Sequence, residues 1–193
     1  MIVIVRHGQT AANADGLLQG RADPPLTELG HRQAAASAAA LPTPSAVVCS
    51  PLHRARQTAA AFGLPVVEDE RWIELDYGGY DGKAFSEVPA EVWARWRQDV
   101  TFAPPEGESL TDVGRRVRAA CEDLCDQADD EDVVVVSHVS PIKAAIAWAL
   151  DVGDEISWRL HCGVATISRI AITDRGPVLR SFNESGHLSE HGA

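Results

Sequence analysis

Three short apolar runs, each followed by a helical pattern, limit the folds that this chain can adopt. The runs cover residues 2–5, 46–49 and 133–136, and polar residues or turn formers bound each of them. Continuous apolar runs of this length are typical of strands that are covered on both faces of a sheet. Strands that alternate with helices predict an α/β fold with a largely parallel central sheet.

Serine and threonine residues mark the expected starts of the helices. Thr27 can cap a helix that runs to about residue 41, and Ser109 can cap one that runs to about residue 128. At two places the chain passes from a β-branched strand into Ser-Pro, which predicts N-caps at Ser50 and Ser140. Each of these two helices would direct its N-terminus at the carboxyl edge of the sheet.

Length and charge narrow the class of protein. A chain of 193 residues favours one domain, residues 1–193, and a formal charge of −11 argues against a general affinity for nucleic acid or acidic membranes. No apolar run reaches the roughly 20 residues that a membrane span needs, so we expect a cytoplasmic protein. The four cysteines lack zinc-type spacing; Cys121 and Cys125 share a face of a predicted helix and could form a bridge, but we expect all four to be reduced. The sequence leaves the oligomeric state open.

Cationic side chains gather where the predicted strands end. Arg6 and His7 follow the first strand, Arg54 lies in the first turn of the helix after the second, and His138 follows residues 133–136. The carboxyl ends of parallel strands meet at one edge, and both helix N-termini and guanidinium groups favour phosphate. We therefore expect a local anion-binding pocket in which nearby cations keep His7 neutral, with a lone pair available for attack.

Four motifs, in this order along the chain, carry a family resemblance. They are RHGQT at residues 6–10, SPLHRARQT at 50–58, IELDYGGYDG at 73–82 and VSHVSP at 136–141. Their order, spacing and placement resemble the signatures of the histidine phosphatase superfamily, from residue 2 to about residue 150. The resemblance implies the phosphoglycerate-mutase-like fold, a three-layer α/β/α sandwich, and phosphatase chemistry that needs no metal or other cofactor.

The resemblance also implies roles for the residues at the strand ends. His7 resembles the nucleophile that accepts the phosphoryl group on nitrogen. Arg6, Arg54 and His138 resemble the phosphate clamp, to which backbone N–H groups near the second histidine contribute. Val139 stands where many members have glycine, and its side chain would crowd that backbone contact.

A proton donor for the leaving alkoxide is the remaining requirement of the chemistry. Glu74 matches the family position for this acid, and Asp76 and Asp81 are its local competitors. Asn13 and Gln19 stand where the family often has polar contacts with phosphate or substrate.

Residues 72–108 interrupt the alternation of strands and helices and hold several aromatic side chains. The resemblance implies a cap-like insertion at about 72–108, whose side chains help to choose the leaving group. Each aromatic side chain could instead serve only to pack this segment onto the sheet. Farther along, His187 and His191 are expected to lie in a frayed terminus.

Three functions remain open at this level. Hydrolysis of a small phosphorylated metabolite is favoured over a phosphoglycerate mutase reaction. A mutase needs basic residues to hold a second acidic group of its substrate, and the basic residues between Gly82 and Gly107 are only Lys83, Arg95 and Arg97. A catalytically inactive module that binds phosphate or protein is the third. Residues 138–153 and 158–170 resemble the α-ribazole phosphatase branch, while sugar phosphates and phosphoglycerate derivatives stay open as substrates.

Overall fold

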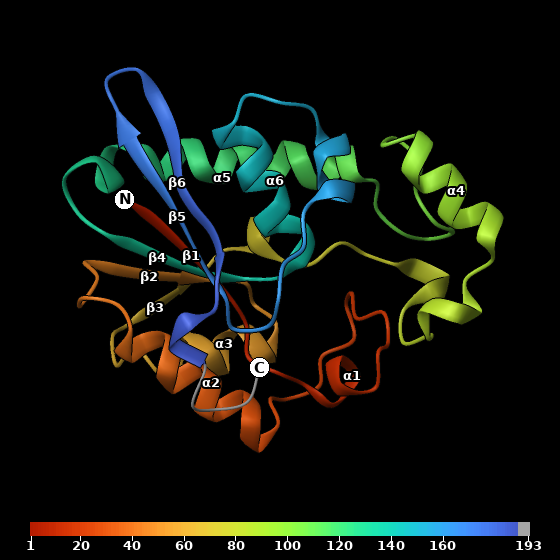
Figure 1. Cartoon of the computed structure of the whole chain (residues 1–193), viewed down its shortest axis with the longest axis horizontal. Coiled ribbons are helices and arrows are strands. Elements are labelled where there is room, and N and C mark those ends of the chain that lie inside the picture. Colours follow the sequence, from red (N-terminus) through yellow and green to blue (C-terminus); the bar gives the residue numbers. More distant parts are fainter. Residues whose placement is uncertain (189–193) are drawn as a thin grey trace.

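A computed structural model describes residues 1–188 and contains one six-stranded sheet in the order β3-β2-β4-β1-β5-β6 (Figure 1). The strands are β1 (Ile2–Arg6), β2 (Ala46–Cys49), β3 (Val66–Glu68), β4 (Val133–Ser137), β5 (Ile167–Thr173) and β6 (Gly176–Glu184). Strands β3, β2, β4 and β1 pair in parallel, and β5 and β6 are antiparallel to their neighbours. The largely parallel sheet is confirmed.

Helices cover both faces of this sheet. The α-helices of residues 1–188 are α1 (Ala11–Ala14), α2 (Glu28–Ala39), α3 (His53–Ala60), α4 (Ala90–Gln98), α5 (Leu110–Asp130) and α6 (Val139–Ala149). Figure 1 shows α5 and α6 on one face and α2 and α3 on the other, which makes the three layers of the expected α/β/α sandwich. Within residues 1–188 no helix is long and apolar enough to cross a membrane.

The strand β1 shows why its apolar run is continuous. Ile2 and Ile4 belong to the core under α5 and α6, whereas Val3 and Val5 belong to a second core that α3 helps to form. All four side chains are at most 1% exposed. The partner strand β4 divides between the two cores in the same way, because successive side chains of a strand point to opposite faces.

Two of the expected N-caps are confirmed. The side chain of Thr27 accepts a hydrogen bond from the backbone N–H of Gly30 at the start of α2. Ser109 precedes α5 and forms a capping box with Asp112. Both caps depend only on residues three apart, which is why the sequence alone could place them.

The N-caps expected at the two Ser-Pro steps are wrong. Helix α3 begins at His53 after Leu52, because the Ser50 hydroxyl is used by His138, whose Nε2 lies 2.7 Å away. Helix α6 begins at Val139, directly after His138, and its first N–H groups are satisfied by a carboxylate rather than by Ser140.

The expectation of a frayed terminus is wrong for His187. This residue lies in the 3₁₀ helix η5 (Gly186–Leu188), where its Nε2 is 2.9 Å from the carbonyl oxygen of Ala165 and 3.2 Å from Oγ of Ser37. His191 lies outside the described residues. All four cysteines are free.

Between β3 and α5 the chain leaves the layers of the sandwich. This segment contains the 3₁₀ helices η1 (Glu70–Trp72), η2 (Gly78–Tyr80) and η3 (Phe85–Glu87) as well as α4. Figure 1 shows α4 beside the sheet rather than over either face. Trp96 of α4 is 1% exposed and belongs to the same core as Ile2, so the segment packs firmly onto the sandwich.

Candidate active site at the carboxyl edge of the sheet

Strand pairing brings His7 and His138 together. In the register of β1 and β4, Arg6 lies opposite Ser137, so that each histidine is the next residue after a paired position. The backbone N–H of His7 donates to the carbonyl of Ser137 at 3.0 Å, and the two imidazole centroids are 5.0 Å apart. The convergence expected from the strand ends is therefore present.

His7 is held with one ring nitrogen free of a proton. Its Nδ1 lies 2.7 Å from the carbonyl oxygen of Gly8, which can only accept, so Nδ1 carries the proton and Nε2 the lone pair. The Nε–H of Arg54 donates to Nε2 at 3.3 Å. Burial, followed by the charges of Arg54 and Arg6, lowers the pKa of His7 well below its ordinary value of 6.5. The imidazole is therefore neutral at neutral pH.

Arg54 is completely buried beside His7. Its guanidinium donates to the carbonyl oxygens of Ala22 at 2.8 Å and Gly20 at 2.9 Å. Burial lowers the pKa of Arg54 to about 10, so the side chain is still a cation at neutral pH. The loop that receives it is fixed by Asp81, whose carboxylate accepts from the backbone N–H groups of Gly20 and Ala22.

His138 lies behind His7, at the N-cap of α6. It is completely buried, and its Nε2 faces the Ser50 hydroxyl. Its Nδ1 has no hydrogen-bond partner among residues 1–188. Burial and then the charge of Arg54 lower the pKa of His138 well below its ordinary value, so this ring is also neutral at neutral pH.

The carboxylate of Glu74 accepts three backbone hydrogen bonds. Leu75 and Ser140 donate to Oε1 at 2.8 and 3.0 Å, and Val139 donates to Oε2 at 2.9 Å. The side chain is 3% exposed and takes the place of a cap on α6. The N–H of Val139 is therefore accessible to an anionic group in spite of the valine side chain.

The two competitors of Glu74 are engaged elsewhere. Asp76 accepts from the backbone N–H of Gly78 and lies 3.9 Å from the guanidinium of Arg21. Asp81 holds the loop beside Arg54. Of the three acidic side chains, only Glu74 lines the cavity that contains His7.

This cavity has a volume of about 420 Å³. Arg6, His7, Asn13, Gln19, Glu74 and Val139 line it, whereas Arg54 and His138 support it from behind. Asn13 and Gln19 are linked through Thr10, whose Oγ1 lies 3.1 Å from Oδ1 of Asn13 and 2.7 Å from Oε1 of Gln19. The sequence-predicted residues thus gather at one place.

Sequence reasoning missed several residues at the cavity. Lys143 lines it from α6, and its Nζ donates to the carbonyl oxygen of Ser157 at 2.9 Å. A helical spacing of four residues from Val139 could have found Lys143. Trp158 lines the cavity from the 3₁₀ helix η4 (Asp154–Arg159), and nothing local in the sequence indicates this position.

A partly buried ion pair holds the backbone that carries Glu74. The guanidinium of Arg116, on α5, donates to both carboxylate oxygens of Glu108, at 2.8 and 2.9 Å. It also reaches the carbonyl oxygens of Arg71 at 2.6 Å and Glu74 at 3.4 Å. The stretch at residues 105–109 therefore has a structural task next to the candidate acid.

A family model for the histidine phosphatase superfamily (branch 1) matches residues 2–185. The chain belongs to the histidine phosphatase superfamily. A bifunctional protein of Mycobacterium tuberculosis is 38% identical over 97% of this chain and 54% of its own length. The chain thus spans about half the length of the mycobacterial relatives that it matches.

Two solved phosphatase structures share the fold over nearly the whole chain. Phosphoserine phosphatase from Entamoeba histolytica, solved with phosphoserine, superposes with a TM-score of 0.90 at 28% identity, over 97% of this chain and 98% of that chain. The α-ribazole phosphatase from Shigella flexneri has a TM-score of 0.82 at 28% identity, over 95% and 96%. These relatives confirm the phosphoglycerate-mutase-like fold.

Proposed function

We propose that this protein is a phosphatase that hydrolyses a small phosphomonoester through a phosphohistidine on His7. The observation that carries the proposal is the state of His7, a neutral imidazole whose unprotonated Nε2 lies at a cavity beside two guanidinium groups. A neutral nitrogen can attack phosphorus, and Arg6 and Arg54 can neutralise charge on the equatorial phosphate oxygens. No step requires a metal ion.

The first half of the reaction transfers the phosphoryl group. The lone pair of His7 Nε2 forms the new N–P bond while the bond between phosphorus and the ester oxygen breaks. The departing alkoxide takes a proton from Glu74. In the second half water attacks phosphorus and gives a proton to Glu74, and the N–P bond breaks to return the electron pair to Nε2.

The N-terminus of α6 supports this role of Glu74. Free N–H groups at the start of a helix bind phosphate, and here those of Val139 and Ser140 hold the Glu74 carboxylate. A bound phosphate would share these donors and would therefore lie beside the Glu74 carboxyl group. This position would bring the leaving oxygen close to the proposed proton donor.

A phosphoglycerate mutase is a weaker candidate. The basic side chains of Lys83, Arg95 and Arg97 lie 5.2, 4.6 and 5.9 Å from the ring centroids of Tyr80, Phe102 and Trp158. In the described part of the chain none of the three lines the cavity. A mutase must hold a second acidic group during the reaction, and this arrangement favours hydrolysis. The presence of every reacting group argues against an inactive binding module.

The α-ribazole phosphatase branch supplies a candidate substrate. Residues 138–153 and 158–170 resemble that branch, and the Shigella flexneri enzyme shares the fold. We propose α-ribazole phosphate as one substrate to test among phosphorylated metabolites.

Phosphate release by the purified protein tests the proposal. The panel contains p-nitrophenyl phosphate, α-ribazole phosphate, 3-phosphoglycerate and sugar phosphates, each with EDTA. We expect release in EDTA, and a loss of more than about a thousandfold in His7→Ala, because the nucleophile is removed. His53→Ala is the matched control, since His53 is exposed on α3. Release that survives in His7→Ala would contradict the phosphohistidine.

A further inference from the structure

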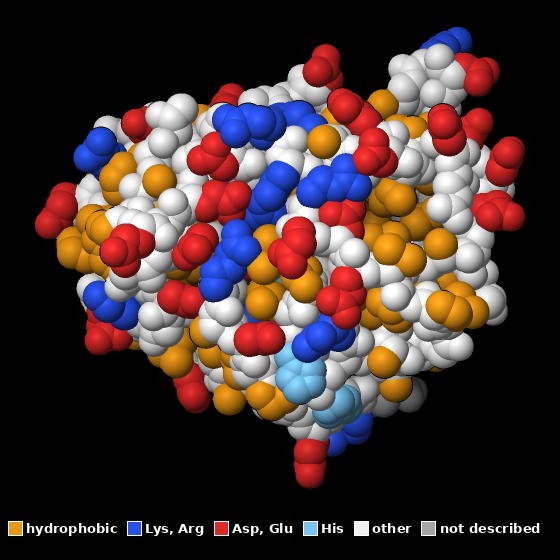
Figure 2. Space-filling view, turned by 180° about the vertical axis from the view of Figure 1, so that it is seen from behind, with side chains coloured by type: hydrophobic (Ala, Val, Ile, Leu, Met, Phe, Trp, Pro, Cys, Tyr) orange, Lys and Arg blue, Asp and Glu red, His pale blue; other side chains and the backbone are white. Residues whose placement is uncertain are grey.

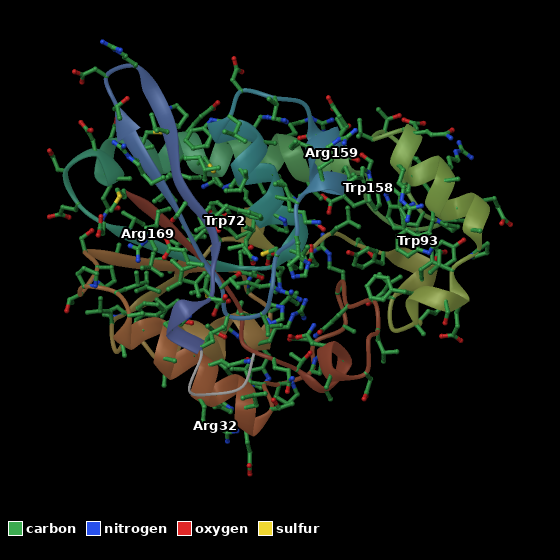
Figure 3. The ribbon with its side chains drawn as sticks, viewed as in Figure 1. Arg32, Trp72, Trp93, Trp158, Arg159 and Arg169 are labelled. Atoms are coloured by element: carbon green, nitrogen blue, oxygen red, sulfur yellow. The ribbon has the colours of Figure 1, made fainter. Side chains whose placement is uncertain are left out.

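Aromatic side chains from separate segments form one wall of the cavity. Trp93 on α4 lies 6.3 Å from Trp158 on η4, measured between ring centroids, with the planes at 88°. Trp96 stacks on Trp93 at 5.6 Å, and Tyr77 meets Trp96 at 5.8 Å. Figure 3 shows Trp93 and Trp158 at the cavity between α4 and the sandwich, far from the core residue Trp72.

Packing alone does not explain this wall. Phe102 contacts Trp96 at 6.0 Å within the same cluster, but it does not line the cavity in the described structure. Phe85 does line it, stacks on Trp93 at 5.9 Å and is still 55% exposed. An exposed phenylalanine beside a cavity is apolar surface that a bound ligand would remove from water.

Few charged side chains line the cavity. Among residues 1–188 the Arg, Lys, Asp and Glu side chains that line it are Arg6, Lys143 and Glu74. Arg6 and Glu74 belong to the phosphate site, and the ammonium of Lys143 donates to Ser157. A carboxylate that lay against the indole rings would lose hydration there, so the wall itself favours an uncharged group.

We infer that the substrate is a phosphomonoester whose alcohol carries a flat, uncharged aromatic ring, and that Trp93 and Trp158 select it. This inference rests on the proposed function. Phosphate would lie against Arg6 and His7, and the ring would contact the aromatic wall. Ring-on-ring contacts add to the burial of apolar surface, so both wall residues contribute to binding.

Two alkyl phosphates test the inference without a change in leaving-group chemistry. Benzyl phosphate and ethyl phosphate both release an ordinary alcohol, so a difference in kcat/KM between them measures the contribution of the aromatic ring. We expect a ratio of about tenfold or more in favour of benzyl phosphate, and poorer hydrolysis of O-phosphoserine. A ratio near one, or a preference for O-phosphoserine, would overturn the inference.

Variants of the wall residues then test whether the aromatic ring of the substrate contacts Trp93 and Trp158. Trp158→Leu and Trp93→Leu should each lower kcat/KM for benzyl phosphate about tenfold, through KM, and leave ethyl phosphate within about twofold. Phe102→Leu is the matched control, because it loosens the same cluster without touching the cavity, and the substrate ratio should stay unchanged. Equal losses on both substrates in the tryptophan variants would overturn the assignment.

The proposed function is tested separately with p-nitrophenyl phosphate, which needs little help from the protein to leave. If the wild-type protein hydrolyses it in a manner that depends on His7 but does not prefer benzyl to ethyl phosphate, only the inference about the ring fails. If no ester is hydrolysed, the proposed function fails.

Discussion

Glu74 combines two tasks at the scale of a single residue. Its carboxylate replaces a local N-cap on α6, and the same group is the proposed proton donor. A helix that is capped by a distant carboxylate keeps that carboxylate beside the reacting atoms without a flexible loop. The stability of α6 and the position of the acid are therefore coupled.

Glu74→Gln separates the acid from the cap. The amide oxygen can still accept from two of the three backbone N–H groups, whereas the amide NH2 cannot accept from the third, and the side chain cannot donate an acidic proton. We expect kcat/KM for ethyl phosphate to fall by about a hundredfold or more, and that for p-nitrophenyl phosphate far less, because nitrophenolate leaves without a proton. Asp76→Asn, outside the cavity, should leave both rates unchanged. Equal slowing of both substrates by Glu74→Gln would exclude the role.

The sequence allowed us to predict which side chains meet at the strand ends, but not the hydrogen bonds between residues that are distant in the sequence. Arg6, His7 and His138 follow apolar runs, and parallel pairing brings such ends together whatever the loops do. The bond between Ser50 and His138 joins residues 88 apart, and that between Glu74 and Val139 joins residues 65 apart. A backbone N–H carries no side-chain signature in the sequence, so this cap was not predictable.

At the scale of elements, helix α2 rests directly on the turn after β1. A Cβ atom added to Gly8 would lie 2.3 Å from the carbonyl oxygen of Gly30, and one added to Gly30 would lie 2.2 Å from that of Gln9. Both distances are far below van der Waals contact. The two glycines allow a helix backbone to support the residue that follows His7.

Gly30→Ala should push these elements apart. We expect the free energy of unfolding to fall by about 1–3 kcal/mol and the hydrolysis rate to fall as well, because the turn that carries His7 shifts. Gly79→Ala is the control, since the nearest atom to its added Cβ is 4.0 Å away. Urea unfolding and p-nitrophenyl phosphate hydrolysis measure both effects. A fully stable and active Gly30→Ala would show that the contact yields without strain.

Among the elements, the strands with continuous apolar runs were predictable and the antiparallel edge was not. Strand β5 carries half-buried polar positions such as Arg169, and its pairing with β6 includes register shifts. These features weaken the period-two pattern that identifies a strand. The segment that brings Trp158 to the cavity is shaped by its contacts with α6 and α5 rather than by local sequence.

At the scale of the whole molecule, an acidic chain encloses a site that holds neutral histidines beside a guanidinium group. The chain has a formal charge of −11, and Figure 2 shows basic side chains interleaved with acidic ones over the rear face. The buried site instead holds two neutral histidines, His7 and His138, next to Arg54. Folding therefore suppresses protonation of both rings.

Stability should fall as the pH drops below about 6.5. In the unfolded chain both histidines titrate near 6.5, whereas the folded pKa of each is lower, so the unfolded state takes up more protons in this range. The stability present above pH 6.5 is lost as the pH falls toward the folded pKa values. We expect a loss of about 2–3 kcal/mol between pH 7.5 and 5.5, measured by urea unfolding.

A histidine variant serves as the control for this pH effect. His138→Asn removes one of the two titrating groups. Over the same pH range, the free energy of unfolding of this variant should therefore fall by about half as much as that of the wild-type protein. An identical pH dependence in both proteins would assign the effect to other groups.

The pairing of His7 limits how this chain can change in evolution. The backbone N–H of His7 donates to the carbonyl oxygen of Ser137, and the backbone carbonyl of His7 accepts from the N–H of Ala165. The backbone of this residue is therefore fixed from both sides. An insertion or deletion within β1 or β4 would turn every later side chain to the opposite face. Residues 85–98, which contain η3 and α4, take no part in strand pairing. We therefore expect that length changes in residues 85–98 can alter the proposed aromatic wall while the reacting groups are inherited intact.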